Sequence, residues 1–169
     1  LEELRRADMI MLTRVNQCSH DEIQSIIDRL REVARHVPVV ETVHTPICLE
    51  SLADAARLDI HCLHGKKVFA FCAIGNPVSF RKSIESLGGE LLGFRVFPDH
   101  HVYTSSELRG LNTEALRIRP DAIIITQKDK VKIKNVRNLW DFPLWTLKMG
   151  VRIVKGYEIF ENKINAILH

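Results

Sequence analysis

The chain has 169 residues, of which 46% are hydrophobic and 27% are charged, and its formal net charge is +3. This length and composition predict one soluble globular domain over residues 1–169. The small net charge gives no reason to expect a nucleic-acid partner, no apolar run is long enough to span a bilayer, and the four cysteines, which lack a C-x-x-C pair, predict reduced thiols.

The first part of the chain predicts a strand, a helix and a second strand. Residues 9–12 form a short apolar run that is typical of a buried strand. Ser19 with Glu22 three residues later fits a capping box, and apolar residues at helical spacing behind it predict a helix over residues 20–36. A proline follows this helix, and residues 39–43 predict a second strand.

The middle of the chain begins with an ambiguous stretch. Residues 45–64 show no clear period, and a short helix around residues 49–58 is one interpretation. Residues 67–72 are strongly strand-like. Asn76, followed by a proline, is a good N-cap for a helix that runs to residue 87, where two glycines end it.

The rest of the chain continues the alternation of strands and helices. Residues 90–97 predict a strand, a second capping box at Thr104 and Glu107 begins a helix over about 105–118, and residues 122–126 predict a buried strand. The remaining patterns predict strands at 143–146 and 151–154 and a helix at 157–168. This alternation predicts an α/β fold with a mainly parallel sheet flanked by helices.

Three of the predicted strands are followed by polar clusters. The clusters are Gly75 and Asn76; Asp99, His100, His101 and Tyr103; and Thr126, Gln127, Lys128 and Asp129. Ligands bind beyond the carboxyl ends of the strands in an open parallel sheet, so we expect the clusters to share one edge. Together they offer anion donors at a helix N-terminus, an acid–base pair and a cationic point charge. That combination suits a phosphate-bearing substrate.

Each cluster also has a structural explanation. Asn76 would cap a helix in any protein, and Lys128 with Asp129 could form a solvated surface pair. Asp99 could simply accept backbone amides in the turn after the strand. Two adjacent histidines are harder to place in a core because both rings would need partners, which favours a functional interpretation for that pair. The structural interpretation applies to His20, His36, His44, His61, His64 and His169.

The Asp-His-His sequence also raises the question of a metal site. Phosphoesterases named for this motif bind manganese through several further aspartate motifs. This sequence has no D-x-D motif, and Asp8 and Asp121 precede their predicted strands, which puts them at the opposite edge of the sheet. A metal needs more ligands than the motif alone supplies, so we expect no metal ligands here.

Several runs of this sequence resemble a known enzyme family. The run FAFCAIGNPVSF at 69–80, then LGG at 87–89 and FPDHHVYT at 97–104, closely resembles tetraacyldisaccharide 4′-kinase, the lipid A 4′-kinase. Residues 6–8 with 12–14, and the run ITQKDKVK at 125–132, match in order, and Gln127 departs from the Glu that the family more often has. The resemblance covers nearly the whole chain.

The resemblance implies transfer of the γ-phosphate of ATP to the 4′-hydroxyl of a tetraacyl glucosamine disaccharide 1-phosphate, a step in the biosynthesis of lipid A and lipopolysaccharide. The family is a P-loop kinase that uses a Walker A loop and Mg²⁺, and neither that loop nor an Asp-Asp stretch occurs here. The chain also begins with Leu1 in LEELRRAD, which is typical of a helix already under way. We therefore expect the carboxyl-terminal portion of a longer kinase, inactive alone and without bound ATP or Mg²⁺.

The resemblance also implies roles for single residues. His100 would be the catalytic histidine, working with an aspartate of the missing amino-terminal P-loop portion, and Asp99 would orient its ring. Candidates for substrate or phosphate binding are Gly75, Asn76, His101, Tyr103, Lys128 and Asp129. The expected partner is the lipid A disaccharide precursor, with peripheral contact at the cytoplasmic face of the bacterial inner membrane. A non-catalytic binding module and, less favoured, a metal-dependent phosphoesterase stay open as alternatives.

Overall fold

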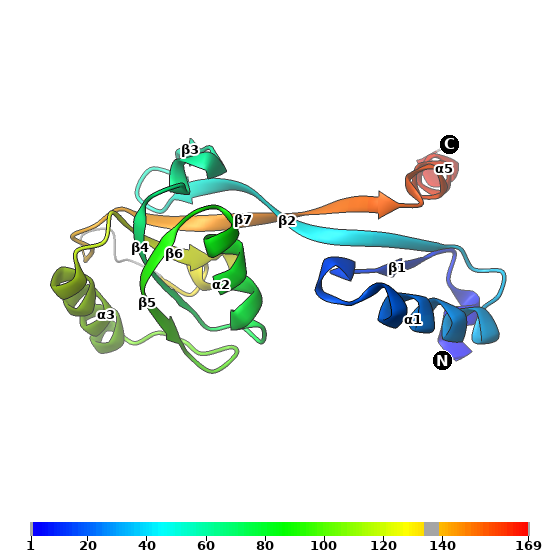
Figure 1. Ribbon diagram of the computed structural model, residues 1–169, viewed down its shortest axis with the longest axis horizontal. Helices are drawn as coiled ribbons and strands as arrows, with labels where there is room; N and C mark the ends of the chain where they lie inside the picture. Colours follow the sequence, from blue (N-terminus) through cyan, green and yellow to red (C-terminus); the bar gives the residue numbers. More distant parts are fainter. Residues whose placement is uncertain (1, 134–138, 169) are drawn as a thin grey trace. The chain divides into compact units, whose positions relative to one another are not determined.

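The computed structural model describes residues 2–133 and 139–168 (Figure 1). The chain divides into two compact units. The central unit is Pro46–Met149, and the terminal unit combines Leu1–Thr45 with Gly150–His169. The prediction of a single domain over residues 1–169 stays a prediction.

The terminal unit contains two of the predicted helices and one predicted capping box. Its elements are η1 (Glu2–Arg6), β1 (Ile10–Leu12), η2 (Val15–Gln17), α1 (His20–Val33), α5 (Tyr157–Leu168), the start of β2 (Val39–Ser51) and the end of β7 (Leu144–Lys155). The Ser19 side chain accepts from the N–H of Glu22, whose carboxylate accepts from the Ser19 N–H, so the predicted capping box is confirmed. β1 pairs in parallel with β2.

The central unit holds most of the sheet. Its further elements are β3 (Arg57–Leu58), η3 (Ile60–Leu63), β4 (Lys67–Cys72), α2 (Pro77–Ser86), β5 (Glu90–Val96), α3 (Ser105–Ile118), β6 (Ala122–Thr126) and α4 (Gln127–Lys130). The strand order is β1-β2-β7-β6-β4-β5, with β3 antiparallel to β2. β4 pairs in parallel with both β5 and β6, and β6 pairs in parallel with β7. The predicted mainly parallel α/β sheet is confirmed.

Alternation along β4 and β6 builds a core on each face of the central sheet. Phe69 and Phe71 belong to the cluster that α3 covers, whereas Val68 and Ala70 belong to the cluster that α2 covers. Successive strand residues point to opposite faces, which is why one strand serves both clusters. Figure 1 shows α2 and α3 on opposite sides of these strands. Loops at the strand ends are therefore the parts of this unit left for a site.

Two sequence predictions about secondary structure are wrong. The helix around residues 49–58 is absent, because β2 continues to Ser51 and Leu49 pairs with Leu58 of β3. The sequence hides this strand because Pro46, which has no N–H to donate, lies inside it. The separate strands at 143–146 and 151–154 are one strand, β7, which runs unbroken from Leu144 to Lys155 between β6 and β2 in the strand order.

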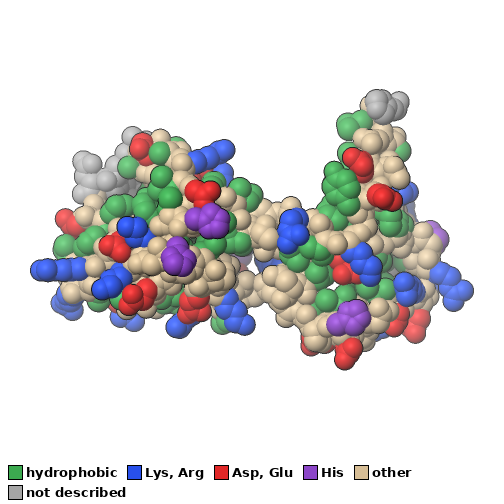
Figure 2. Space-filling model, turned by 45° about the horizontal axis from the view of Figure 1, so that its top comes forward, with side chains coloured by type: hydrophobic (Ala, Val, Ile, Leu, Met, Phe, Trp, Pro, Cys, Tyr) green, Lys and Arg blue, Asp and Glu red, His purple; other side chains and the backbone are tan. Residues whose placement is uncertain are grey.

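The surface of the described residues carries charges of both signs. Lys and Arg side chains are interspersed with Asp and Glu on the face drawn in Figure 2. None of the described helices is long and apolar enough to cross a membrane.

Candidate active site

The three polar clusters follow neighbouring parallel strands. Cys72 at the end of β4 pairs with Val96 at the end of β5, and β6 runs parallel on the other side of β4. Parallel strands present their carboxyl ends at the same edge, and the clusters lie directly after those ends. We call this edge, with the loops 73–76, 97–104 and 126–129, the candidate edge.

The loop after β4 approaches the loop after β5 closely at Gly75. A Cβ atom added to Gly75 would lie 3.2 Å from Oδ2 of Asp99, so a larger side chain would crowd the carboxylate. Asn76 caps α2 by accepting from the N–H of Ser79 at 3.0 Å, and Pro77 takes the first helical position. The predicted cap is confirmed. Because Gly75 has no side chain, the loop after β4 can lie close to Asp99 in the loop after β5.

Asp99 and His100 lie in a tight turn after β5. The N–H of His101 donates to the Pro98 carbonyl at 3.1 Å, and His100 has a left-handed backbone with φ of 63°. Oδ1 of Asp99 accepts from the His100 N–H at 3.0 Å, while Oδ2 lies 3.7 Å from Nε2 of His100. The His100 side chain is 87% exposed. Asp99 thus fixes the turn and faces the ring, and the imidazole is open to a substrate.

His101 has different surroundings from its neighbour. Its Nε2 lies 3.1 Å from Oε2 of Glu107, its ring stacks on Phe97 with centroids 5.0 Å apart, and it is 25% exposed. Hydrogen bonds from Thr104 and then from His101 lower the pKa of Glu107. Glu107 also completes the capping box of α3. These contacts fix His101 to the start of α3.

Asp129 and Tyr103 are buried beneath the candidate edge. Oδ1 of Asp129 accepts from the Tyr103 hydroxyl at 2.9 Å and from the Ala73 N–H at 3.0 Å, and Asp129 has no exposed surface. Burial, together with the nearby charge and hydrogen bond of Asp129, raises the pKa of Tyr103 above its ordinary range. Both were predicted to bind substrate, and that role stays a prediction.

Lysines gather around the end of β6. Lys128 is exposed, whereas Lys132 donates from Nζ to the Ala73 carbonyl at 2.9 Å. Lys130 and Lys148 pair with Glu50, and their hydrogen bonds lower the pKa of its carboxyl. The sequence reasoning missed the roles of Lys132 and Glu50. For Lys132 the available signal was its position three residues after Asp129, while nothing local marks Glu50.

The sequence lacks a phosphate-binding loop motif, and the part of the chain that the structure describes lacks a cluster of metal-binding side chains. No G-x-x-x-x-G-K-[ST] loop occurs in the sequence. Among residues 2–133 and 139–168, no group of three or more His, Cys, Asp or Glu side chains could hold a metal ion.

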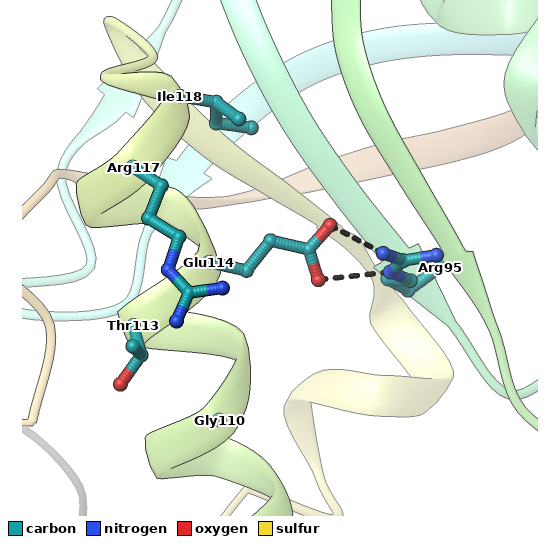
Figure 3. Close-up of a pocket in the computed structure, with 6 residues that line it drawn as sticks. All are labelled: Arg95, Gly110, Thr113, Glu114, Arg117 and Ile118. Atoms are coloured by element: carbon teal, nitrogen blue, oxygen red, sulfur yellow. Dashed lines mark hydrogen bonds and ion pairs between the residues drawn. The ribbon is translucent and has the colours of Figure 1, made fainter.

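A pocket of about 520 Å³ lies between β5 and α3, beside the candidate edge rather than in it (Figure 3). Its lining includes Arg95, whose Nε and Nη2 both lie 2.8 Å from the carboxylate of Glu114. Figure 3 shows this paired contact, with Arg117 on the same helix as Glu114. The residues that line this pocket include none of the predicted site residues.

The fold and the candidate edge place the chain in a class. The structure is similar to that of "apo" form LpxK from Aquifex aeolicus in complex with ATP, with a TM-score of 0.60, 23% sequence identity, and coverage of 99% of this chain and 45% of that chain. The likeness shows that this chain has the α/β fold of the matched part of that LpxK chain.

The family follows from the sequence comparisons. The family model described as Tetraacyldisaccharide-1-P 4'-kinase matches residues 1–169, and the chain belongs to this family. Relatives named Tetraacyldisaccharide 4'-kinase include one from Syntrophus aciditrophicus, 34% identical over 166 residues, and one from Anaeromyxobacter sp. strain Fw109-5, 31% identical over 168 residues. These matches cover 95% and 98% of this chain but 44% of each relative. The chain therefore spans less than half the length of these relatives.

Proposed function

We propose that this chain is the carboxyl-terminal portion of a lipid A 4′-kinase and forms the acceptor side of its active site. The reaction is transfer of the γ-phosphate of ATP to the 4′-hydroxyl of a tetraacyl glucosamine disaccharide 1-phosphate. The observation that carries the proposal is the exposed imidazole of His100 beside Asp99, at the carboxyl end of β5, in a chain of this family.

In this proposal His100 accepts the proton of the sugar hydroxyl, and Asp99 orients the ring. A sugar hydroxyl is a poor nucleophile, and phosphoryl transfer depends mainly on positioning and charge. Oδ2 of Asp99 lies 3.7 Å from Nε2 of His100, which is close enough for the carboxylate to orient the imidazole ring. The exposed Lys128 supplies positive charge toward phosphate groups at the same edge.

The remaining parts of the site belong to the portion of the parent outside this chain. That portion supplies the Walker A loop, Mg²⁺ and the aspartate that works with His100. The lipid substrate gives the parent a peripheral position at the cytoplasmic face of the bacterial inner membrane. The isolated chain accordingly has no 4′-kinase activity and binds ATP more weakly than about millimolar, the range in which few specific contacts are made.

The test is a phosphoryl-transfer assay on the full-length parent with ATP and the tetraacyl disaccharide 1-phosphate. The wild-type parent should phosphorylate the 4′-position, and His100→Ala should lower kcat by about 10²–10⁴ with little change in KM for ATP. A parent that binds the lipid but never transfers phosphate would favour the non-catalytic module. Manganese-dependent hydrolysis of phosphodiesters by the chain would favour the phosphoesterase.

A further inference from the structure

Asp129 is a fully buried carboxylate that holds two loops of the candidate edge at once. Its Oδ1 accepts from the N–H of Ala73, which begins the loop leading to Gly75, at 3.0 Å. The same oxygen accepts from the hydroxyl of Tyr103, at the end of the loop that carries His100, at 2.9 Å. One atom therefore anchors the loop after β4 and the loop after β5.

Lys132 completes this anchor. Its Nζ lies 3.7 Å from Oδ1 of Asp129 and donates to the Ala73 carbonyl at 2.9 Å. The backbone N–H of Ala73 is therefore bound by Asp129 and its backbone carbonyl by Lys132. The hydroxyl of Thr126 donates to Oδ2. A buried charge is tolerated only when it is paired and hydrogen-bonded, and Asp129 meets both conditions.

Tyr103 connects Asp129 to the turn that contains Asp99 and His100. Its ring meets Phe97 edge-on at 5.2 Å and His101 edge-on at 5.5 Å, and these two residues flank Asp99 and His100. On the other loop, the narrow space between Gly75 and Asp99 leaves little room for displacement. A shift of either loop would therefore move the His100 imidazole.

We propose that Asp129, together with Lys132, is a positioning residue for phosphoryl transfer: it sets the two loops so that His100 meets the acceptor hydroxyl, without touching substrate itself. This inference rests on the proposed function. A displacement of about 1 Å at a reacting group can lower the rate about 10²-fold, so loss of the anchor should appear in kcat.

Kinetics of the full-length parent give the first test. Asp129→Asn and Lys132→Met should each lower kcat about 10-fold to 10²-fold and change KM for ATP less than about 2-fold, because the nucleotide is held elsewhere. Lys132→Arg, which keeps the charge, should recover most of the rate. The matched control is Asp121→Asn, since Asp121 accepts from the Lys67 N–H at 2.8 Å at the opposite edge of the same strands and should keep wild-type kcat.

Tyr103→Phe provides a second, milder variant in case Asp129→Asn fails to fold. It removes one hydroxyl and keeps the aromatic ring in the core, and it should lower kcat with the same pattern as Asp129→Asn. Wild-type kcat in Asp129→Asn and Tyr103→Phe, measured per folded molecule, would overturn the proposal. So would a loss of kcat in Asp121→Asn equal to that in Asp129→Asn, because the effect would then be general destabilisation.

Nuclear magnetic resonance on the 169-residue chain tests the anchor without any assay of activity. In Asp129→Asn and Tyr103→Phe, the resonances of the His100 ring and of the Gly75 amide should shift, while the Lys67 amide should not. Unmoved His100 and Gly75 signals overturn the inference even if the parent is an active kinase. If these signals shift but the parent never transfers phosphate, the proposed function is wrong, while the inference that Asp129 positions the two loops is supported.

Discussion

His100 and His101 are neighbours in sequence, yet the structure gives them different partners and different backbones. His100 is exposed and has a φ of 63°, a conformation that L-residues other than glycine adopt at a cost of about 1 kcal/mol. His101 is packed between Phe97 and Glu107. Backbone strain that persists at an exposed polar residue is often found at functional sites.

This contrast predicts opposite effects of two substitutions. His100→Gly should leave the chain as stable as wild type or more stable by about 0.5–1 kcal/mol, because glycine adopts positive φ without strain. His101→Ala should destabilise the chain by about 1–2 kcal/mol through lost stacking and a lost contact to Glu107. Urea denaturation of the two variants measures both changes. A destabilised His100→Gly beside an unaffected His101→Ala would contradict the described turn.

Cys72 predicts a loss of stability in alkali. Burial, with the nearby charge of Asp129, raises the pKa of this thiol from its ordinary value of 9.0 to about 12. The folded chain thus keeps a proton that the unfolded chain releases. Stability is fully present below pH 9 and falls as the pH rises toward 12, by up to about 1.4 kcal/mol per pH unit.

Urea titrations at pH 8, 9 and 10 under reducing conditions measure this slope. Cys72→Ala should flatten it between pH 9 and 10, whatever its effect on stability at pH 8. Cys18→Ala is the matched control, because Cys18 is exposed, and it should leave the slope unchanged. An equal slope in Cys72→Ala and wild type would show that the thiol is not the group responsible.

At the scale of elements, β5 and α3 each contain a glycine, and the two have different surroundings. A Cβ on Gly93 of β5 would lie 2.9 Å from Cδ2 of the buried Phe69 ring and 3.3 Å from Ile118. A Cβ on Gly110 of α3 would meet nothing within 4 Å. Space, and not residue type, therefore decides what an added methyl group does at each position.

The two substitutions to alanine should change the stability of the chain in opposite directions. Gly93→Ala should destabilise the chain by about 1–3 kcal/mol, since the aromatic core must shift to admit the methyl group. Gly110→Ala should stabilise it by roughly 0.5–1 kcal/mol through the higher helix propensity of alanine. Denaturant midpoints of the two variants check the pair. Equal effects would mean that the space around the two glycines does not differ as described.

The elements with local signals could be predicted from sequence, and those without them could not. Both capping boxes and the Asn76 cap lie within three residues of their partners, so the pattern alone revealed them. The length of β2 depends on pairing with distant strands, which overrides the proline at position 46.

The same reasoning applies to the candidate site. The exposed Asp99 and His100 could be proposed from their position after a strand. The contact of Asp129 with Ala73 joins residues 56 apart in sequence, and a fully buried carboxylate is rare enough that sequence favours an exposed one. The burial of Asp129, and hence the part played by Lys132, required the fold.

At the scale of the whole molecule, burial is unevenly distributed among the elements. β4 and β6 consist largely of residues with no exposed surface, whereas no residue described in α5 is buried. Exposed hydrophobic side chains on α5 include Tyr157, Ile167 and Leu168, and hydrophobic side chains are visible along this helix in Figure 2. Helices without tertiary packing are only marginally stable at this length.

Hydrogen exchange should reflect this distribution. Amides of β4 and β6 should exchange most slowly and those of α5 should be among the fastest, because opening α5 exposes no buried side chains. Exchange followed by mass spectrometry on the 169-residue chain measures both. Protection of α5 equal to that of β6, independent of protein concentration, would show that this helix is packed in the chain itself.

The division of the chain into two units also implies an order in which they fold during synthesis. The central unit is one continuous stretch, while the terminal unit needs segments from both sides of it. During synthesis at about 5–20 residues per second, the first segment, with α1, waits roughly 5–20 seconds while the central unit is made. Ribosome-bound chains stalled once residue 149 has emerged should resist proteolysis in the central unit and be cleaved in residues 1–45. The candidate edge can therefore be complete before the second segment of the terminal unit, which includes α5, has been made.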